Sequence, residues 1–376
     1  MKIFVDGYEA NVPQRLGSGQ VAFNLLKNIE KLDKKNDYTV LLPGSPMMDL
    51  PKERTGWKYR VLKPNKLWTR VALPAALYLT RNKPDLFFSP THYIPKFSPV
   101  KRIVTIFDLA YLHFPQMFQK KDLWKLTHWT KESIENAAHI ITISNSAKKD
   151  ILKNYGKKSK EVTVAYPGYN SGVFYPINDK AKIESVKEKY KIEGDYIIYI
   201  GTIQPRKNLI RLIEAFQKIE GLKLVIVGKT SGLGRQGWMY EEVLKKPEEL
   251  GMEDRVIFTG FVPDEDLKYL LNGAMTFILP SLYEGFGIPV VDAMACKIPV
   301  IVSNISSLPE VVGEAGLLVN PNSQDQIEQA IRVSYADKKL RAKMIKTGVE
   351  QAKKFSWEKM AKIVLKTFEE VERKGD

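Results

Sequence analysis

Cysteine is almost absent from this 376-residue sequence, in which Cys296 is the single one. A lone cysteine cannot form a disulfide within the chain, which favours a reducing compartment such as the cytoplasm. Long hydrophobic runs are absent too: the most apolar short stretch, 71–79, is far below the roughly 20 residues that span a membrane. The opening residues MKIFVDG read as a strand and not as a secretory leader. We therefore expect a cytoplasmic protein, either soluble or peripheral on the inner face of a membrane.

Negative charge is scarce in the first half of the chain. Residues 1–175 hold 28 Lys and Arg against 14 Asp and Glu, a balance of +14, while the remainder holds 30 against 29, which completes the total of +15. Such a basic half predicts an anionic partner: nucleic acid, an anionic membrane or phosphorylated substrates. No helix-turn-helix, zinc or RNA-binding aromatic signature is present, so we do not expect nucleic acid.

Strand and helix patterns alternate along the whole chain, which is 44% hydrophobic and 27% charged. Short runs rich in β-branched and aromatic residues are separated by stretches with helical periodicity, which predicts an α/β fold with parallel sheets. The predicted strands are 2–7, 38–43, 85–90, 102–108, 139–144 and 161–166 in the first half, and 196–201, 222–228, 255–260, 275–280, 299–303 and 316–320 in the second. Each set suffices for one doubly wound sheet.

The length allows two such domains. We predict an N-terminal Rossmann-like domain over 1–170, a turn-rich linker over 171–178 and a C-terminal Rossmann-like domain over 179–355. We also predict a final helix in 356–376 that crosses back to the N-terminal domain. The final helix has a Ser cap at its start, and one face carries Trp357, Ala361, Val364 and Phe368. Two doubly wound domains facing a central cleft commonly bind a nucleotide there.

Two carboxylates flank a glycine loop in the segment LPSLYEGFGIPVVDAMACKIPVIVS (279–303). Glu284 follows a predicted strand, and Gly285 and Gly287 leave backbone amides uncovered beside the start of a helix. Pro289 suits the first helical position, and we expect Asp292 in the first turn. Carboxylates and free amides together predict a site for a polyhydroxylated ligand. The alternative for Asp292 is that it only complements the helix dipole, and for Glu284 that it is a solvated loop residue.

A second loop, after the predicted strand 196–201, carries adjacent cations. Arg206 and Lys207 precede a helix whose expected N-cap is Asn208. The face of that helix predicted to be buried consists of Leu209, Leu212, Ile213 and Phe216. Two cations at the positive end of a helix dipole are favourable if they bind an anion with two charges, such as a diphosphate. The alternative is a solvated basic pair.

At this point the motifs resemble a known family. GTIQPRKN (201–208), GFVPDEDLKYLLNGA (260–274) and the segment 280–303 resemble the retaining GT-B glycosyltransferases of family 4, the glycosyl transferases group 1, and RLGSGQVAFNLL (15–26) resembles their first domain more loosely. The resemblance implies an enzyme that transfers a sugar from a nucleotide diphosphate-sugar with retention at the anomeric carbon. It also implies independence from metal ions and cofactors, and the sequence shows no Asp-x-Asp in a fitting context and no His/Cys ligand set.

The resemblance also implies residue roles. Arg206 and Lys207 would hold the diphosphate, with Glu284 at the donor sugar and Asp292, where the family usually has Glu, at the ribose. The rest of the implied donor-binding set is Gly17, Gly19, Thr202, Phe261, Val262, Tyr283, Gly285, Phe286 and Gly287.

The first-domain motif departs from the family at one position. Many members have His-Asp-Leu where this chain has Phe107-Asp108-Leu109, and that His contacts the donor sugar. Asp108 remains as a catalytic candidate that would contact the acceptor or donor. His92 and His113 are candidates to reach the space that Phe107 leaves without a polar group, although a packed or surface His is the alternative for each.

The segment 118–134 combines four lysines with Trp124 and Trp129. Lys with interfacial Trp on a helix favours an anionic membrane surface or a lipid-diphosphate acceptor. The alternative is a solvated helix whose Trp side chains lie in the core.

The sequence leaves the donor and the acceptor open. The neighbourhood of 107–115 resembles polysaccharide mannosyltransferases, which implies GDP-mannose as donor and a saccharide or lipid-linked acceptor in cell-surface polysaccharide or glycolipid synthesis. A UDP-sugar-dependent glucosyl- or N-acetylhexosaminyltransferase is the alternative. The alternative from another class is a non-catalytic basic protein that binds membranes or nucleic acid. A nicotinamide dehydrogenase would need G-x-G-x-x-G after the first strand, and 5–19 does not supply it.

Overall fold

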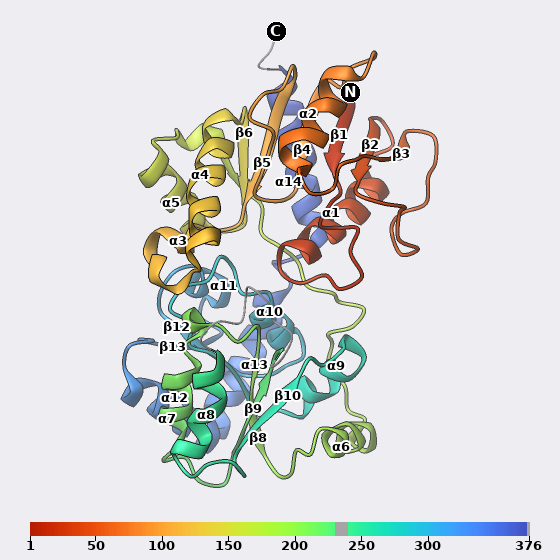
Figure 1. Cartoon of the computed structure of the whole chain (residues 1–376). Coiled ribbons are helices and arrows are strands. Elements are labelled where there is room, and N and C mark those ends of the chain that lie inside the picture. The colour runs from red at the N-terminus through yellow and green to blue at the C-terminus, as the bar shows by residue number, and fades with distance from the viewer. Residues whose placement is uncertain (230–239, 374–376) are drawn as a thin grey trace. The chain divides into compact units, whose positions relative to one another are not determined.

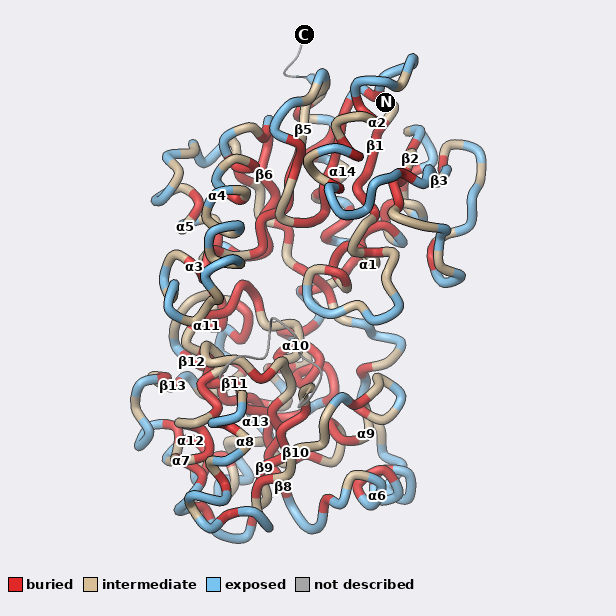
Figure 2. The backbone as a smooth tube through the Cα atoms, viewed as in Figure 1, coloured by how far each residue is buried: buried red, intermediate tan, exposed pale blue. Residues whose placement is uncertain are grey.

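The computed structural model describes residues 1–229 and 240–373, and the chain forms two compact units (Figure 1). Unit 1 comprises Met1–Gly168 and the C-terminal stretch from Ser356, and unit 2 comprises Tyr169–Phe355. The border after Gly168 lies close to the predicted domain end at 170, and the border before Ser356 coincides with the start of the predicted final helix. In each unit the central strands are buried along most of their length, as Figure 2 shows, whereas the edge strands are more exposed.

Unit 1 contains a parallel sheet with strand order β3-β2-β1-β4-β5-β6-β7. Its strands are β1 (Lys2–Asp6), β2 (Asp37–Leu42), β3 (Trp57–Val61), β4 (Leu86–Ser89), β5 (Lys101–Ile106), β6 (His139–Thr142) and β7 (Val162–Val164). The prediction missed β3, because at the edge of the sheet only Trp57 of its five residues is buried. An edge strand of this kind lacks the continuous apolar run of a strand covered on both faces.

The principal helices of unit 1 are α1 (Ser18–Leu32), α2 (Leu73–Leu79), α3 (Ala110–His113), α4 (Lys120–Asn136), α5 (Asn145–Tyr155) and α14 (Trp357–Arg373). The last of these, from the far end of the chain, packs against α1, and its Phe368 ring meets Phe88 of β4 at a centroid distance of 5.1 Å. The Ser356 hydroxyl accepts from the Lys359 amide at 3.1 Å, as the Ser cap predicted. The four residues predicted to share an apolar face are all buried.

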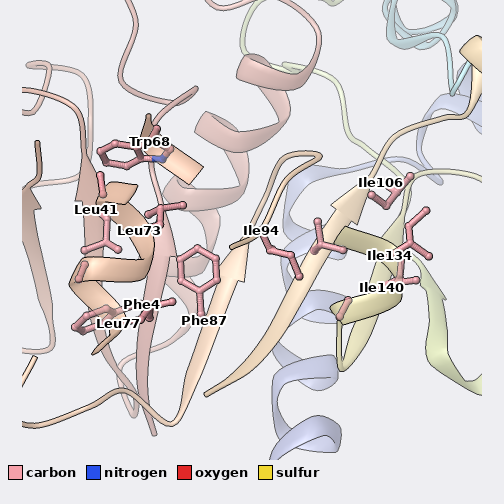
Figure 3. Packing of buried hydrophobic residues seen from close by; sticks show 14 of the residues in the cluster. Phe4, Leu41, Trp68, Leu73, Leu77, Phe87, Ile94, Ile106, Ile134 and Ile140 are labelled. Atoms are coloured by element: carbon pink, nitrogen blue, oxygen red, sulfur yellow. The ribbon is translucent and has the colours of Figure 1, made fainter. Parts of the chain in front are cut away.

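The core on one side of this sheet joins α2 to the strands. Leu73 and Leu77 of α2 belong to the same buried cluster as Phe4 of β1 and Phe87 of β4. Trp68 is also a member of this cluster (Figure 3). Each fully buried side chain of this size stabilises the fold by roughly 1.5–3 kcal/mol relative to exposure. The core therefore packs α2 against β1 and β4.

Unit 2 contains a second parallel sheet with strand order β10-β9-β8-β11-β12-β13. Its strands are β8 (Tyr196–Ile200), β9 (Lys223–Val227), β10 (Val256–Gly260), β11 (Thr276–Leu279), β12 (Val300–Ser303) and β13 (Gly316–Val319). Its helices in the described residues are α6 (Lys180–Lys189), α7 (Leu209–Phe216), α8 (Tyr240–Glu249), α9 (Asp264–Gly273), α10 (Ile288–Ala295), α11 (Leu308–Val312), α12 (Gln324–Ala336) and α13 (Lys338–Ala352). All six predicted strands are found, so both units are Rossmann-like. The strand order reverses between β8 and β11, the usual place for a ligand in such sheets.

Candidate functional site

The loops that follow β8 and β11 lie side by side because these two parallel strands are neighbours. The Leu282 amide donates to the Arg206 carbonyl at 2.8 Å and so joins the two loops. Both motifs singled out in the sequence therefore meet at the carboxyl edge of one sheet.

Arg206, Lys207 and Glu284 form an ion-pair cluster at this edge. The Arg206 guanidinium donates to Glu284 Oε2 at 3.1 Å and to the Tyr283 carbonyl at 2.8 Å, and Lys207 Nζ pairs with Glu284 Oε1. The Glu284 side chain is 7% exposed and that of Lys207 12%. The alternatives of a solvated basic pair and a solvated Glu284 are therefore wrong. The two cations share a counter-charge within the protein, and the three groups together keep one net positive charge.

Hydroxyl groups from two loops hold the Glu284 segment in place. The Ser281 hydroxyl donates to Glu284 Oε1 at 2.7 Å. Ser306 accepts from the Glu284 amide at 3.0 Å, and Ser307 donates to the Glu284 and Phe286 carbonyls at 2.8 and 3.2 Å. The sequence reasoning missed these serines, although Ser306 and Ser307 follow β12, the neighbour of β11, at the same edge of the sheet.

The charge state of Glu284 follows from two opposing effects. Burial alone would raise the pKa of its carboxyl. The nearby Lys207 and Arg206 charges and the hydrogen bonds from Lys207 and Ser281 together outweigh burial and lower the pKa to about 2. Glu284 is therefore ionised throughout the physiological range and keeps both cations in position.

Asn208 does not cap α7 through its side chain, contrary to the prediction. Its amide instead donates to the Pro280 carbonyl at 3.0 Å and the Pro321 carbonyl at 2.7 Å, and its oxygen accepts from Arg211. Its backbone is left-handed, with φ 62°, a conformation that Asn tolerates better than most residues. Asn208 thus ties the basic loop to the loops after β11 and β13. The helix face predicted to be buried is confirmed.

Gly287 occupies a position that requires glycine. Its φ is 101°, and a Cβ there would lie 2.9 Å from Leu308 Cδ2. Gly285 and Tyr283 are buried, and Phe286 packs edge-on against Phe355 with centroids 5.3 Å apart. Helix α10 begins at Ile288, so Pro289 is its second residue, one position later than predicted.

Asp292 lies in the second turn of α10, so its predicted place in the first turn is wrong. The alternative, that it only complements the helix dipole, is not supported either, because that effect is confined to the first turn. Its side chain is buried, and within residues 1–229 and 240–373 no group hydrogen-bonds its Oδ1 atom. Burial, and then the charge of Asp264, raises the pKa of Asp292 well above its ordinary value. A buried carboxyl group of this kind can bind a ligand hydroxyl. The sequence reasoning missed Asp264, which opens α9.

Three other residues of the implied donor set lie on neighbouring loops of unit 2. Phe261 is 49% exposed directly after β10, while Val262 is buried. Thr202 follows β8, and its carbonyl accepts from the Tyr199 hydroxyl at 3.2 Å. They stand after β8 and β10, at the same edge of the sheet as the ion-pair cluster.

The candidates from the first half of the chain belong to unit 1. Gly17, with φ 50°, precedes α1, and Gly19 is buried in its first turn. Asp108 follows β5 and accepts from the Ala110 amide at 2.9 Å. His92 packs its ring on Phe107 at a centroid distance of 5.0 Å, whereas His113 bonds to Asp150 at 2.9 Å. Of the two histidines, His92 is the one that the structure brings to Phe107.

The two tryptophans of α4 differ in their surroundings. Trp124 is 57% exposed and stacks on His128 at 4.5 Å. Trp129 is partly buried, with Arg70 and Lys125 against its ring at 4.6 and 4.8 Å and Tyr93 edge-on. No helix in the described residues is long and apolar enough to cross a membrane.

Comparison with known proteins gives consistent matches for both halves. The model of Glycosyltransferase Family 4 matches residues 17–172, and that of Glycosyl transferases group 1 matches residues 181–351. O-antigen chain mannosyltransferase B of Escherichia coli is 33% identical over 302 residues, which are 80% of this chain and 76% of that protein. The serotype-specific mannosyltransferase WbdA of Escherichia coli is 31% identical over 241 residues, 62% of this chain but only 29% of that protein.

Among solved structures, Anabaena Alr3699/HepE in complex with UDP and glucose superposes with a TM-score of 0.76 at 18% identity, covering 98% of this chain and 99% of that one. This likeness concerns the fold. The relative at 33% identity and the family matches on both halves show that the chain belongs to glycosyltransferase family 4, and the fold likeness shows its GT-B architecture of two Rossmann-like units.

Proposed function

We propose that this protein is a mannosyltransferase of cell-surface polysaccharide or glycolipid synthesis. In this proposal it transfers mannose from GDP-mannose, with retention at the anomeric carbon and without a metal ion or other cofactor, to a saccharide or lipid-linked acceptor. The names of the two relatives support mannose as the transferred sugar and polysaccharide synthesis as the process. The observation that carries the proposal is the cluster of Arg206 and Lys207 held by a buried Glu284.

The chemistry of such a transfer explains why this cluster is suitable. When the bond between the anomeric carbon and the phosphate oxygen breaks, the electron pair leaves with the nucleoside diphosphate, and negative charge builds on it. Cations fixed beforehand stabilise that charge at little reorganisation cost. Arg206 and Lys207 would act in this way, in the role that a divalent ion plays in other transferases. The acceptor hydroxyl attacks the same face of the sugar, and its proton passes to the departing phosphate.

A thermal-shift panel with GDP, UDP, ADP and their common sugars, with and without EDTA, tests the donor. Binding raises Tm by mass action, and we expect the largest shift with GDP and GDP-mannose, unchanged by EDTA. The Arg206→Ala variant should lose this shift. NMR of the product then reports the anomeric configuration. A shift abolished by EDTA would contradict metal independence, and an inverted product would contradict retention.

A UDP-sugar donor is the second candidate, since the fold neighbour HepE was solved with UDP and glucose. A selective shift with UDP-glucose or a UDP-N-acetylhexosamine would favour it over GDP-mannose. Retention on heparin or DNA with no nucleotide shift would favour the non-catalytic alternative.

We further propose that the protein is cytoplasmic and attaches peripherally to anionic membrane through α4. The exposed ring of Trp124 and the exposed Lys120, Lys121 and Lys125 support this surface. Vesicles containing anionic lipid should retain the protein at low salt, and Trp124→Ala should weaken retention. If such vesicles retain it no better than neutral ones, the membrane proposal fails.

A further inference from the structure

The segment from Leu67 to Lys83 of unit 1 differs from the other surface helices in its composition. It consists of a short π-helix, η1 (Trp68–Ala72), then α2 and the four residues that follow α2. Helix α2 has the sequence LPAALYL, in which every residue is apolar or aromatic. The outer face of a surface helix normally carries polar residues. Here only the Tyr78 hydroxyl is available for it, so the solvent-facing side of α2 is apolar as well.

The inner side of α2 is already occupied by the core of unit 1. Leu73 and Leu77 are buried in the same cluster as Phe87 of β4 (Figure 3). The next residue of that strand, Phe88, meets Phe368 of α14. Because successive side chains of a strand point to opposite faces of the sheet, α2 and α14 cover opposite faces.

Four apolar side chains of this segment are exposed instead of packed. At its start Leu67 is 54% exposed and Val71 42%, and at its end Tyr78 is 49% exposed and Leu79 80%. We call these four residues the apolar strip. Single exposed apolar residues are common on protein surfaces, but several on one short segment mark an interaction surface.

The charge around the apolar strip has one sign. Residues 54–84 contain eight Lys and Arg and no Asp or Glu. Exposed cations stand at both ends of the strip, and we call them the flanking cations: Lys63, Lys66, Arg81 and Lys83. A second copy of the chain would bring the same cations against this surface and be repelled. Apolar side chains between two groups of cations are instead typical of a helix that lies in the interface of an anionic bilayer.

Arg70 of η1 connects this segment with α4. Its guanidinium pairs with Glu132 and lies 4.6 Å from the centroid of the Trp129 ring. The two helical segments are therefore neighbours in the layer that covers one face of the sheet. We propose that the apolar strip inserts into the interface of an anionic lipid bilayer, with the flanking cations on the lipid phosphates. This inference rests on the proposed membrane attachment and adds an inserting element to the surface of α4.

A fluorescent probe at position 79 tests the insertion directly. The native Cys296 is only 2% exposed, so a thiol-reactive bimane labels Leu79→Cys selectively. On vesicles of phosphatidylcholine and phosphatidylglycerol we expect its emission to shift to the blue and to be quenched by lipids with a doxyl group on the acyl chain. The control is Lys362→Cys on the exposed side of α14, which covers the opposite face and should report water throughout.

Vesicle sedimentation measures how much the segment contributes to affinity. Leu79→Ser removes one inserted side chain and should weaken binding about tenfold, while Arg81→Gln removes one cation and should weaken it about fivefold at low salt. Because both side chains are exposed, neither change should disturb the fold. Met48→Ser and Lys31→Gln are the matched controls, since these residues are exposed in unit 1 outside the segment, and both should bind nearly as the wild type does.

The outcomes separate this inference from the proposed function. If the probe at position 79 stays in water on vesicles that retain the protein, the inference fails and the attachment through α4 stands. It also fails if phosphatidylcholine alone retains the protein equally well, or if the emission shifts with protein concentration in the absence of lipid, which would assign the strip to a second copy. If no vesicle retains the protein, both membrane proposals fail, and sugar transfer assayed without vesicles still decides the proposed activity.

Discussion

At the scale of single residues, Glu284 supplies the negative charge that holds Arg206 and Lys207 in position. In Glu284→Gln, the largely buried Arg206 and Lys207 lose the negative charge that Glu284 supplies, which should destabilise the protein by roughly 3 kcal/mol. A bound diphosphate supplies the missing negative charge. We therefore expect a lower Tm for the free variant and a larger stabilisation by GDP than in the wild type, both measured by thermal shift.

The matched control for this prediction is Glu253→Gln, which neutralises an exposed glutamate of the same unit and should behave as the wild type does. A Glu284→Gln protein that GDP stabilises less than the wild type would mean that the carboxylate itself is needed for the nucleotide.

The lowered pKa of Glu284 also predicts a pH dependence. A carboxyl whose pKa falls from 4.5 in the unfolded chain to about 2 in the folded protein stabilises the fold fully above pH 4.5. This stabilisation is lost as the pH falls toward 2. At about 1.4 kcal/mol per pKa unit, the wild type should lose about 2 kcal/mol between pH 6 and pH 3 that Glu284→Gln does not lose. Urea unfolding at the two pH values measures the difference, and equal losses would contradict the ion-pair account.

The sequence placed correctly in the fold those side chains whose position followed from a strand end. The ion-pair cluster joins two loops that the sequence placed after neighbouring strands. Asn208 and Asp292 were misplaced for different reasons. The left-handed backbone of Asn208 directs its amide toward carbonyls of the loops after β11 and β13, and the sequence does not show those carbonyls. The helical turn that contains Asp292 depends on where α10 begins, and helix ends are the least certain part of a pattern-based prediction.

At the scale of elements, buried parallel strands were predicted well because both of their faces are apolar. The edge strand β3 has one buried residue and was missed. The elements that carry the candidate site are the loop after β8 and the junction of β11 with α10, where turn chemistry decides the geometry.

Gly287 provides a test of that junction. An alanine there must adopt φ 101° and bring its Cβ to 2.9 Å from Leu308, so Gly287→Ala should cost about 2–3 kcal/mol and weaken nucleotide binding. Gly251→Ala separates the two effects, because Gly251 has φ 64° with nothing within 4 Å of the added Cβ. We expect that variant to lose about 1 kcal/mol and to bind nucleotide normally. Equal destabilisation of the two variants in urea would show that the contact with Leu308 contributes nothing.

At the scale of the whole molecule, the last helix of the chain completes the first unit. Helix α14 packs on α1 and inserts Phe368 against Phe88, so the N-terminal half alone lacks part of its core. Phe368 is fully buried, and Phe368→Ala should destabilise unit 1 by about 3–5 kcal/mol. Five of the six tryptophans belong to unit 1, so their fluorescence should follow this loss during unfolding in urea.

The control is Phe97→Ala, also in unit 1, because the Phe97 ring is 66% exposed and its removal should change the midpoint by a few tenths of a kcal/mol at most. Nucleotide binding separates the units. Since Arg206, Lys207 and Glu284 lie in unit 2, Phe368→Ala should keep the wild-type Kd for GDP at urea concentrations below its fluorescence transition. A loss of GDP binding in step with the fluorescence would instead mean that the two units unfold as one.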